Sequence, residues 1–86
     1  MHELSIALEI CRMAEVRLGA AALASVVEIG VEVGDDAGIE PANLQFCLEA
    51  LLHEPPFRAA TPVIIRRPGD VLTLGYLEVD DGGPDD

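Results

Sequence analysis

Residues 25–33 read SVVEIGVEV, and they change the apolar period of the chain from that of a helix to that of a strand. Val27, Ile29, Val31 and Val33 fall on one face, and the residues between them are glutamate or glycine. This period of two is typical of a β-strand with one buried and one solvent-facing side. We therefore predict a strand here, followed by a loop at residues 34–38, GDDAG.

Helical periods occur on both sides of this strand. Residues 3–19 predict a helix that ends at Gly19, and Glu3 suits the positive end of its dipole. A second helix is predicted to begin at Glu40-Pro41, because proline is favoured at the first helical position, and to end before Pro55-Pro56. The predicted core stripes are Leu4, Ala7, Leu8, Cys11, Ala14 and Leu18, flanked by Ile6, Ile10 and Met13, in the first helix, and Leu44, Cys47, Leu48 and Leu51 in the second.

Two further strands are expected at the end of the chain. They are residues 61–67, TPVIIRR, and residues 71–79, VLTLGYLEV, joined by a tight turn at residues 68–70. We predict that these two strands pair as an antiparallel hairpin, and the β-α-β part could support a right-handed parallel crossover. The order α-β-α-β-β predicts a two-layer α+β domain with a three-stranded mixed sheet and two helices packed on one face.

Composition limits the classes of partner. The chain has 86 residues, with 16 acidic and 5 basic side chains and a formal net charge of −11. One domain, residues 1–79, is expected, followed by an acidic disordered tail at residues 80–86. The charge argues against nucleic acid or an anionic membrane and is compatible with cations or a basic protein. No leader or membrane span is recognisable, so a cytoplasmic protein is expected.

The residues offer little enzyme chemistry. There are two histidines, and Cys11 and Cys47 form no C-x-x-C pair, so two free, buried thiols are expected. No glycine-rich phosphate loop is present. Ser5 and Ser25 have no histidine at a suggestive spacing. We therefore expect a protein that is not an enzyme.

The amino terminus is the strongest candidate metal site. The free amine of Met1, the intervening amide nitrogen and the His2 imidazole can all face one ion. Nitrogen-rich, tetragonal or square-planar sites suit Ni(II) or Cu(II) better than Zn(II). Glu3 could add its amide nitrogen or its carboxylate.

Simpler interpretations of the same residues remain open. His2 could be an exposed residue at a frayed end. Carboxylates that could add an oxygen ligand are Asp35, Asp36 and Glu40, but the aspartates also suit a solvated turn and Glu40 suits a helix start. His53 suits the end of the second helix, where a cation is favoured.

The opening MHELS, the segment VEIGVEVGDDAGIEPANLQFCLEALL and the closing LGYLEVDD together resemble the HypA/HybF nickel metallochaperones. The resemblance implies that Ni(II) is held by Met1, His2 and Glu3, with His2 as the principal side-chain ligand. It also places Glu40 where the family has an acidic residue near nickel. The implied partners are a maturation GTPase and the [NiFe]-hydrogenase large subunit, or urease maturation proteins.

One departure from the family pattern concerns zinc. Family members carry a zinc ribbon with two C-x-x-C pairs between the second and third strands, whereas here VIIRR runs through PGD into VLTLGYLEV. Two cysteines cannot build a four-cysteine site, so no structural zinc is expected. Two hypotheses follow: a nickel metallochaperone for hydrogenase or urease maturation, or an interaction module that has lost metal delivery. The second would dock a partner protein or form a homo-oligomer through a strand edge.

Overall fold

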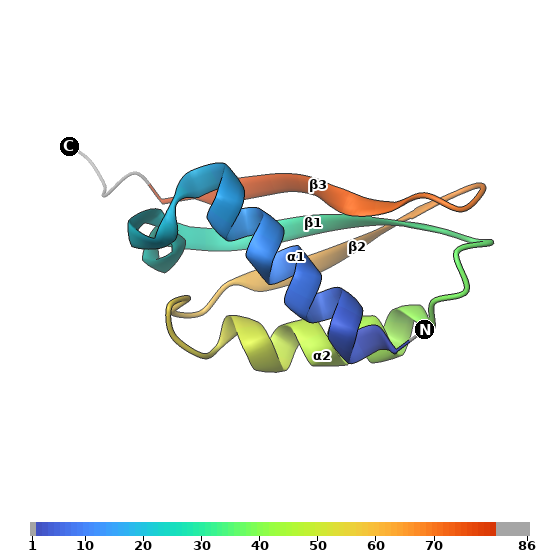
Figure 1. Cartoon of the computed structure of the whole chain (residues 1–86), viewed down its shortest axis with the longest axis horizontal. Helices are drawn as coiled ribbons and strands as arrows, with labels where there is room; N and C mark the ends of the chain where they lie inside the picture. The colour runs from blue at the N-terminus through green and yellow to red at the C-terminus, as the bar shows by residue number, and fades with distance from the viewer. Residues whose placement is uncertain (1, 81–86) are drawn as a thin grey trace.

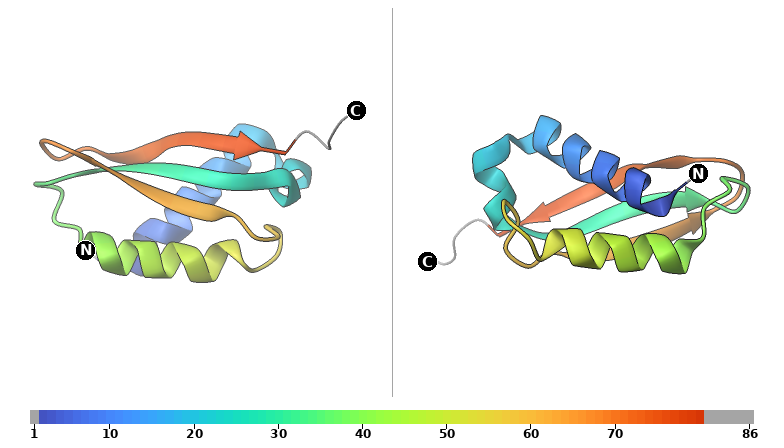
Figure 2. Two further views of the ribbon diagram at one scale, coloured as in Figure 1. Left: turned by 180° about the vertical axis from the view of Figure 1, so that it is seen from behind. Right: turned by 60° about the horizontal axis from the view of Figure 1, so that its bottom comes forward.

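The computed structural model describes residues 2–80 and shows two main helices on one face of a three-stranded sheet (Figure 1). The elements in chain order are helix α1 (Glu3–Leu18), 3-10 helix η1 (Ala20–Ser25), strand β1 (Val26–Gly34), helix α2 (Pro41–Leu52), strand β2 (Thr61–Arg67) and strand β3 (Leu72–Val79). Both turned views keep α1 and α2 on the same side of the sheet (Figure 2). The predicted two-layer α+β class is confirmed; η1, an alanine-rich turn after α1, was not predicted.

The sheet order is β2-β1-β3, so the predicted hairpin pairing is wrong. Strand β1 lies in the centre, parallel to β2 and antiparallel to β3. The short link between β2 and β3 instead crosses the end of β1, a span of about 10 Å for two inter-strand spacings. There the Gly34 N–H donates to the Val71 carbonyl at 2.6 Å, and the Asp35 N–H donates to the Arg67 carbonyl at 2.8 Å.

A glycine at the end of β1 makes this crossing possible. A Cβ atom on Gly34 would lie 2.1 Å from the Gly69 carbonyl oxygen, far inside van der Waals contact. The link therefore passes directly over residue 34, and any side chain there would push it away.

The core lies between the helices and the inner face of β1. The inward residues of β1 are Ile29, Val31 and Val33, as predicted. The buried helix residues are Ala7, Ile10 and Ala14 in α1, and Leu44, Leu48 and Leu52 in α2. Because two of the three buried α1 positions are alanine, this helix can approach its neighbours closely.

Three residues that were predicted to be buried in the core are exposed. Leu4 and Leu8 each keep 52% of their surface exposed, because the buried side of α1 is centred on Ala7, Ile10 and Ala14 instead. Val27 is 40% exposed while Val26 is buried. A register shift between Val26 and Glu28 breaks the alternation at the start of β1.

On the outer face of the sheet, the aromatic ring of Tyr76 covers Gly30. Tyr76 of β3 is the register partner of Gly30 of β1. A Cβ atom on Gly30 would lie 2.1 Å from the Tyr76 ring, so the ring occupies the space that a side chain would need. The Tyr76 hydroxyl donates a hydrogen bond to the Glu28 carboxylate. This bond raises the pKa of Tyr76.

Two further observations complete the fold. Across residues 2–80, the helices are all too short or too polar to cross a membrane. Of the predicted acidic tail, Asp80 is described, and its backbone N–H donates to the Ser25 carbonyl at 2.8 Å. Residues 81–86 lie outside the described residues.

Candidate metal centre

His2 is the residue immediately before α1. Its backbone is extended, with φ −83° and ψ 129°, and its carbonyl accepts the Ile6 N–H at 3.3 Å, which begins the helix. The side chain is exposed, and within residues 2–80 it makes no hydrogen bond or ion pair. The imidazole is therefore available to bind an ion.

The next residue ties the start of the chain to the start of α2. A carboxylate oxygen of Glu3 accepts a hydrogen bond from the backbone N–H of Glu40 at 3.0 Å. Helices α1 and α2 pack on each other, and the dark-blue start of α1 lies beside the green start of α2 (Figure 1). The hydrogen bond therefore fixes the first turn of α1 against the amino-terminal end of α2.

Glu40 caps α2, which confirms its interpretation as a helix-start acid. Its Oε1 accepts the Ala42 N–H at 3.1 Å, and its carbonyl accepts the Leu44 N–H at 3.0 Å. Pro41 occupies the first helical turn, as predicted. The carboxylates of Glu3 and Glu40 thus each accept a backbone N–H at the start of α2, the first from Glu40 and the second from Ala42.

Two carboxylates lie at the amino-terminal ends of the two helices. The hydrogen bond from the Glu40 N–H is the main reason that the pKa of Glu3 lies below its ordinary value of 4.5. The amino-terminal ends of α1 and α2 carry partial positive charge, which the two carboxylates oppose. Within the described chain, each carboxylate uses one oxygen on a backbone N–H and keeps the other oxygen without a hydrogen bond. In each carboxylate, the second oxygen could therefore accept another partner without uncapping α2.

The other candidate acids lie elsewhere. Asp35 pairs with Arg66 at 2.6 Å, and the Asp36 N–H donates to the Gly69 carbonyl at 2.7 Å. Both aspartates therefore belong to the turns at the end of the sheet, as the solvated-turn interpretation expected. His53 is the C-cap of α2, one helix length, about 18 Å, from Glu40.

The cysteines are free, one on each helix, and each is half-buried. Burial raises the pKa of the Cys11 thiol to about 11. This thiol is therefore protonated at neutral pH, as suits a packing residue.

The side chains of residues 2–80 do not by themselves form a complete metal-coordination site. Among residues 2–80, no three histidine, cysteine, aspartate or glutamate side chains converge as a metal site. His2, Glu3 and Glu40 would need backbone nitrogen ligands to complete a coordination sphere. Met1, the fourth predicted ligand, lies outside the described residues.

Sequence reasoning named Glu3 and Glu40 separately but missed the bond between them. The available signal was weak: an acid at the start of one helix and an exposed N-cap at the start of another. These residues are 37 positions apart, and only the packing of α1 on α2 brings them together.

A sequence profile of the family described as "Hydrogenase/urease nickel incorporation, metallochaperone, hypA" matches residues 1–72. The chain belongs to the HypA family. This assignment confirms the resemblance that the sequence suggested, and the matched range runs from the amino terminus, through both carboxylates, to the first residue of β3. No solved structure is similar enough to count as a match.

Curated HypA relatives cover most of the chain. It is 33% identical over 75 residues to the hydrogenase maturation factor HypA of Azotobacter chroococcum mcd 1, which is 87% of this chain and 66% of the relative. It is 35% identical over 75 residues to the protein of the same name from Azotobacter vinelandii, with the same coverage. The protein of that name from Geobacter metallireducens is 33% identical over 69 residues, 80% of this chain and 60% of the relative. The chain thus spans less than two thirds of the length of these curated relatives.

Proposed function

We propose that the chain is a nickel-binding metallochaperone domain that carries Ni(II) as cargo during [NiFe]-hydrogenase or urease maturation. The observation that carries the proposal is the hydrogen bond from the Glu40 N–H to the Glu3 carboxylate. It holds the segment containing His2 beside a capped helix end that has two carboxylates. The HypA family assignment supports nickel as the metal and hydrogenase or urease maturation as the process.

The proposed ligand set combines backbone and side chains. The amine of Met1, an amide nitrogen and the His2 imidazole supply nitrogens in adjacent chelate rings, which favours nickel. Glu3 orients this segment through its bond to α2, and Glu40 offers its second oxygen. Metal binding competes with protons at nitrogen ligands, so mild acid should favour release of the ion.

We base four further parts of the proposal on the family and on the two cysteines: enzymatic activity, location, delivery partners and zinc. We infer no enzymatic activity, a cytoplasmic location, and delivery through a maturation GTPase to the hydrogenase large subunit or to urease maturation proteins. We also infer that the chain holds no structural zinc, because its two cysteines lie on different helices and a structural zinc site commonly needs four ligands.

Nickel titration calorimetry tests this proposal directly. The untagged chain is compared with a version that carries two extra residues before Met1, which displaces the amine but keeps every side chain. Binding by the first and a large loss in the second supports an amino-terminal nickel site. Equal binding by both would move the site to side chains such as His53. No binding by either would reject nickel carriage and favour a protein-interaction module.

A further inference from the structure

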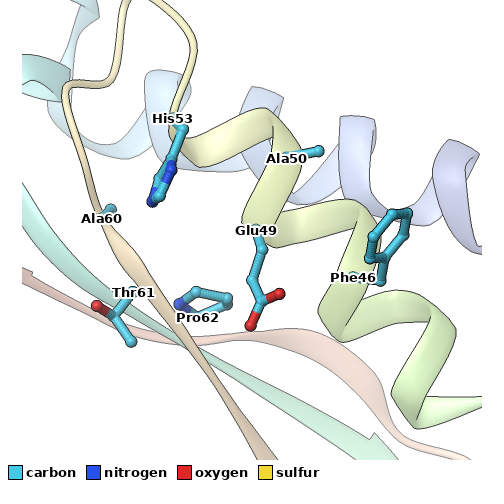
Figure 3. Close-up of a pocket in the computed structure, with 7 residues that line it drawn as sticks. All are labelled: Phe46, Glu49, Ala50, His53, Ala60, Thr61 and Pro62. Carbon is cyan, nitrogen blue, oxygen red and sulfur yellow. The ribbon is translucent and has the colours of Figure 1, made fainter.

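A groove of about 420 Å³ lies between α2 and the start of β2, away from the amino terminus. One wall is formed by residues of α2 at helical spacing: Phe46, Glu49, Ala50 and His53. The other wall is the segment entering β2, residues 60–62. Figure 3 shows His53 and Glu49 pointing from α2 toward this segment.

The part of the groove beside Phe46 is apolar and open to solvent. Phe46 is 70% exposed, although a phenyl ring buries well over 100 Å² when it is covered. It lies on the side of α2 opposite the core residues Leu44 and Leu48, so the fold does not use it. Ala50, also exposed, extends this apolar surface, and the buried Pro62 closes the groove on the β2 side.

The groove also contains a carboxylate without a cation. One oxygen of Glu49 accepts a hydrogen bond from the neutral Gln45 amide at 3.1 Å. The ion pairs of the described chain join Arg12 to Glu9, Arg66 to Asp35 and Arg67 to Glu32. In residues 2–80, therefore, no cation lies within ion-pair distance of Glu49, in a chain of net charge −11.

Backbone pairing is blocked at this point of the sheet. Strand β2 is an edge strand, with β1 on one side. Pro62 has no N–H to donate, and its carbonyl accepts from the Gln45 amide at 3.3 Å. An added strand would find neither group free here, so an occupant must be recognised through side chains.

We propose that this groove docks a segment of a partner protein that presents an apolar side chain next to lysine or arginine. The apolar side chain packs against Phe46 and Ala50, and the cation pairs with Glu49. A second copy of this chain fits less well, because two molecules of charge −11 repel each other and three of the five basic side chains are already paired. This proposal is independent of nickel binding.

A short peptide of the stated chemistry is the probe. The end-blocked peptide GSLKLSG is titrated into the isotope-labelled 86-residue chain, and amide chemical shifts are followed. We expect the largest shifts at Phe46, Glu49 and Thr61. The peptides GSSKSSG, without apolar side chains, and GSLELSG, with the charge reversed, should bind at least about fivefold more weakly.

Two matched pairs of variants locate the site. Phe46→Ser should weaken binding by about fivefold or more, whereas Val16→Ser, at a residue that is 73% exposed on α1, should not change it. Glu49→Gln should weaken binding by about twofold to fivefold, whereas Glu15→Gln, at another exposed acid, should not. Circular dichroism checks that each variant keeps its helix content.

Three outcomes would overturn the proposal. Equal binding of GSSKSSG would mean that charge alone attracts the peptide. Shifts centred outside the groove would place the docking site elsewhere. Concentration-dependent line broadening that Phe46→Ser abolishes, without peptide, would show that the occupant is a second copy of the chain.

Discussion

The carboxylate of Glu3 accepts the backbone N–H of Glu40 across 37 residues of sequence, and so joins the first turn of α1 to the N-cap of α2. Glu40 in turn caps its own helix through the Ala42 N–H. The start of the chain is therefore anchored one residue after His2. If the terminal segment binds a metal as proposed, this anchor reduces the conformational freedom that it loses when it closes around the ion.

Removing the Glu3 acceptor should loosen this corner. In Glu3→Ala, we expect hydrogen exchange at the Glu40 amide to become several-fold faster and nickel affinity to fall, because the change removes the acceptor that protects this amide and anchors the segment containing His2. Glu3→Gln keeps a carbonyl acceptor and should retain much of the protection. Glu15→Ala, at an exposed acid of the same helix, is the control. Unchanged exchange at Glu40 in Glu3→Ala would contradict the hydrogen bond.

The same bond predicts a pH dependence in the metal-free protein. The pKa of Glu3 is lowered by the Glu40 N–H, so the folded state favours the ionised form. Its stabilising effect is present above the ordinary pKa of 4.5 and is lost as the pH falls through the lower folded value. A carboxyl NMR titration should place the Glu3 pKa below 4.5. A midpoint at or above that value would rule the interaction out.

His2 should dominate the side-chain contribution to nickel binding. His2→Ala should reduce nickel affinity by about tenfold or more, measured by calorimetry near neutral pH. Wild-type affinity should fall in mildly acidic solution, because a protonated imidazole cannot ligate a metal. His53→Ala, at the far end of α2, is the control and should bind like the wild type. Nickel affinity that is independent of pH would exclude the imidazole as a ligand.

The close approach of Tyr76 to Gly30 predicts a strong coupling in stability. Gly30→Ala places a methyl group where the ring lies, and we expect a loss of about 1–3 kcal/mol in the free energy of unfolding, measured in urea. The loss should be much smaller when Tyr76→Ala is already present. Gly75→Ala is a milder control, because its Cβ would lie 3.2 Å from the flexible Glu32 side chain. Additive losses from the two changes would contradict the contact.

Cys11 should be unreactive in the folded protein. With a pKa of about 11, roughly one thiol in a thousand is ionised at pH 8, and only the thiolate is alkylated rapidly. Iodoacetamide labelling followed by mass spectrometry should therefore modify Cys11 far more slowly in buffer than in urea. Equal rates in the two conditions would mean that the thiol is not shielded on α1.

The positions of the main helices and strands were predictable because the sequence patterns that mark them are local. The period of two in β1, the proline at the start of α2 and Gly19 after α1 each reflect the conformation of their own neighbourhood. Strand pairing was predicted wrongly, because periodicity says which face is apolar but not which strand lies beside it. The short link between β2 and β3 looked like a hairpin turn, and only Gly34 hinted that it passes over β1.

The residues of the candidate metal centre stay a prediction, and the contacts that the structure shows between them were not predictable. His2, Glu3 and Glu40 could be named from the sequence, and the HypA assignment supports the process in which they would act. The hydrogen bond between Glu3 and Glu40 depends on how α1 packs on α2, which no local pattern encodes. The groove beside Phe46 was also missed. The sequence shows that Phe46 belongs to a helix, but it does not show that residues 60–62 lie next to it and form the other wall.

The central place of β1 has a consequence for biosynthesis. Both of its hydrogen-bonded partners, β2 and β3, come later in the chain, beginning at Thr61 and Leu72. As the chain leaves the ribosome, β1 has no strand beside it until more than half of the domain has been made. The backbone N–H and C=O groups along its two edges are then open to wrong pairing, so the nascent chain is most vulnerable to aggregation between the synthesis of β1 and that of β3.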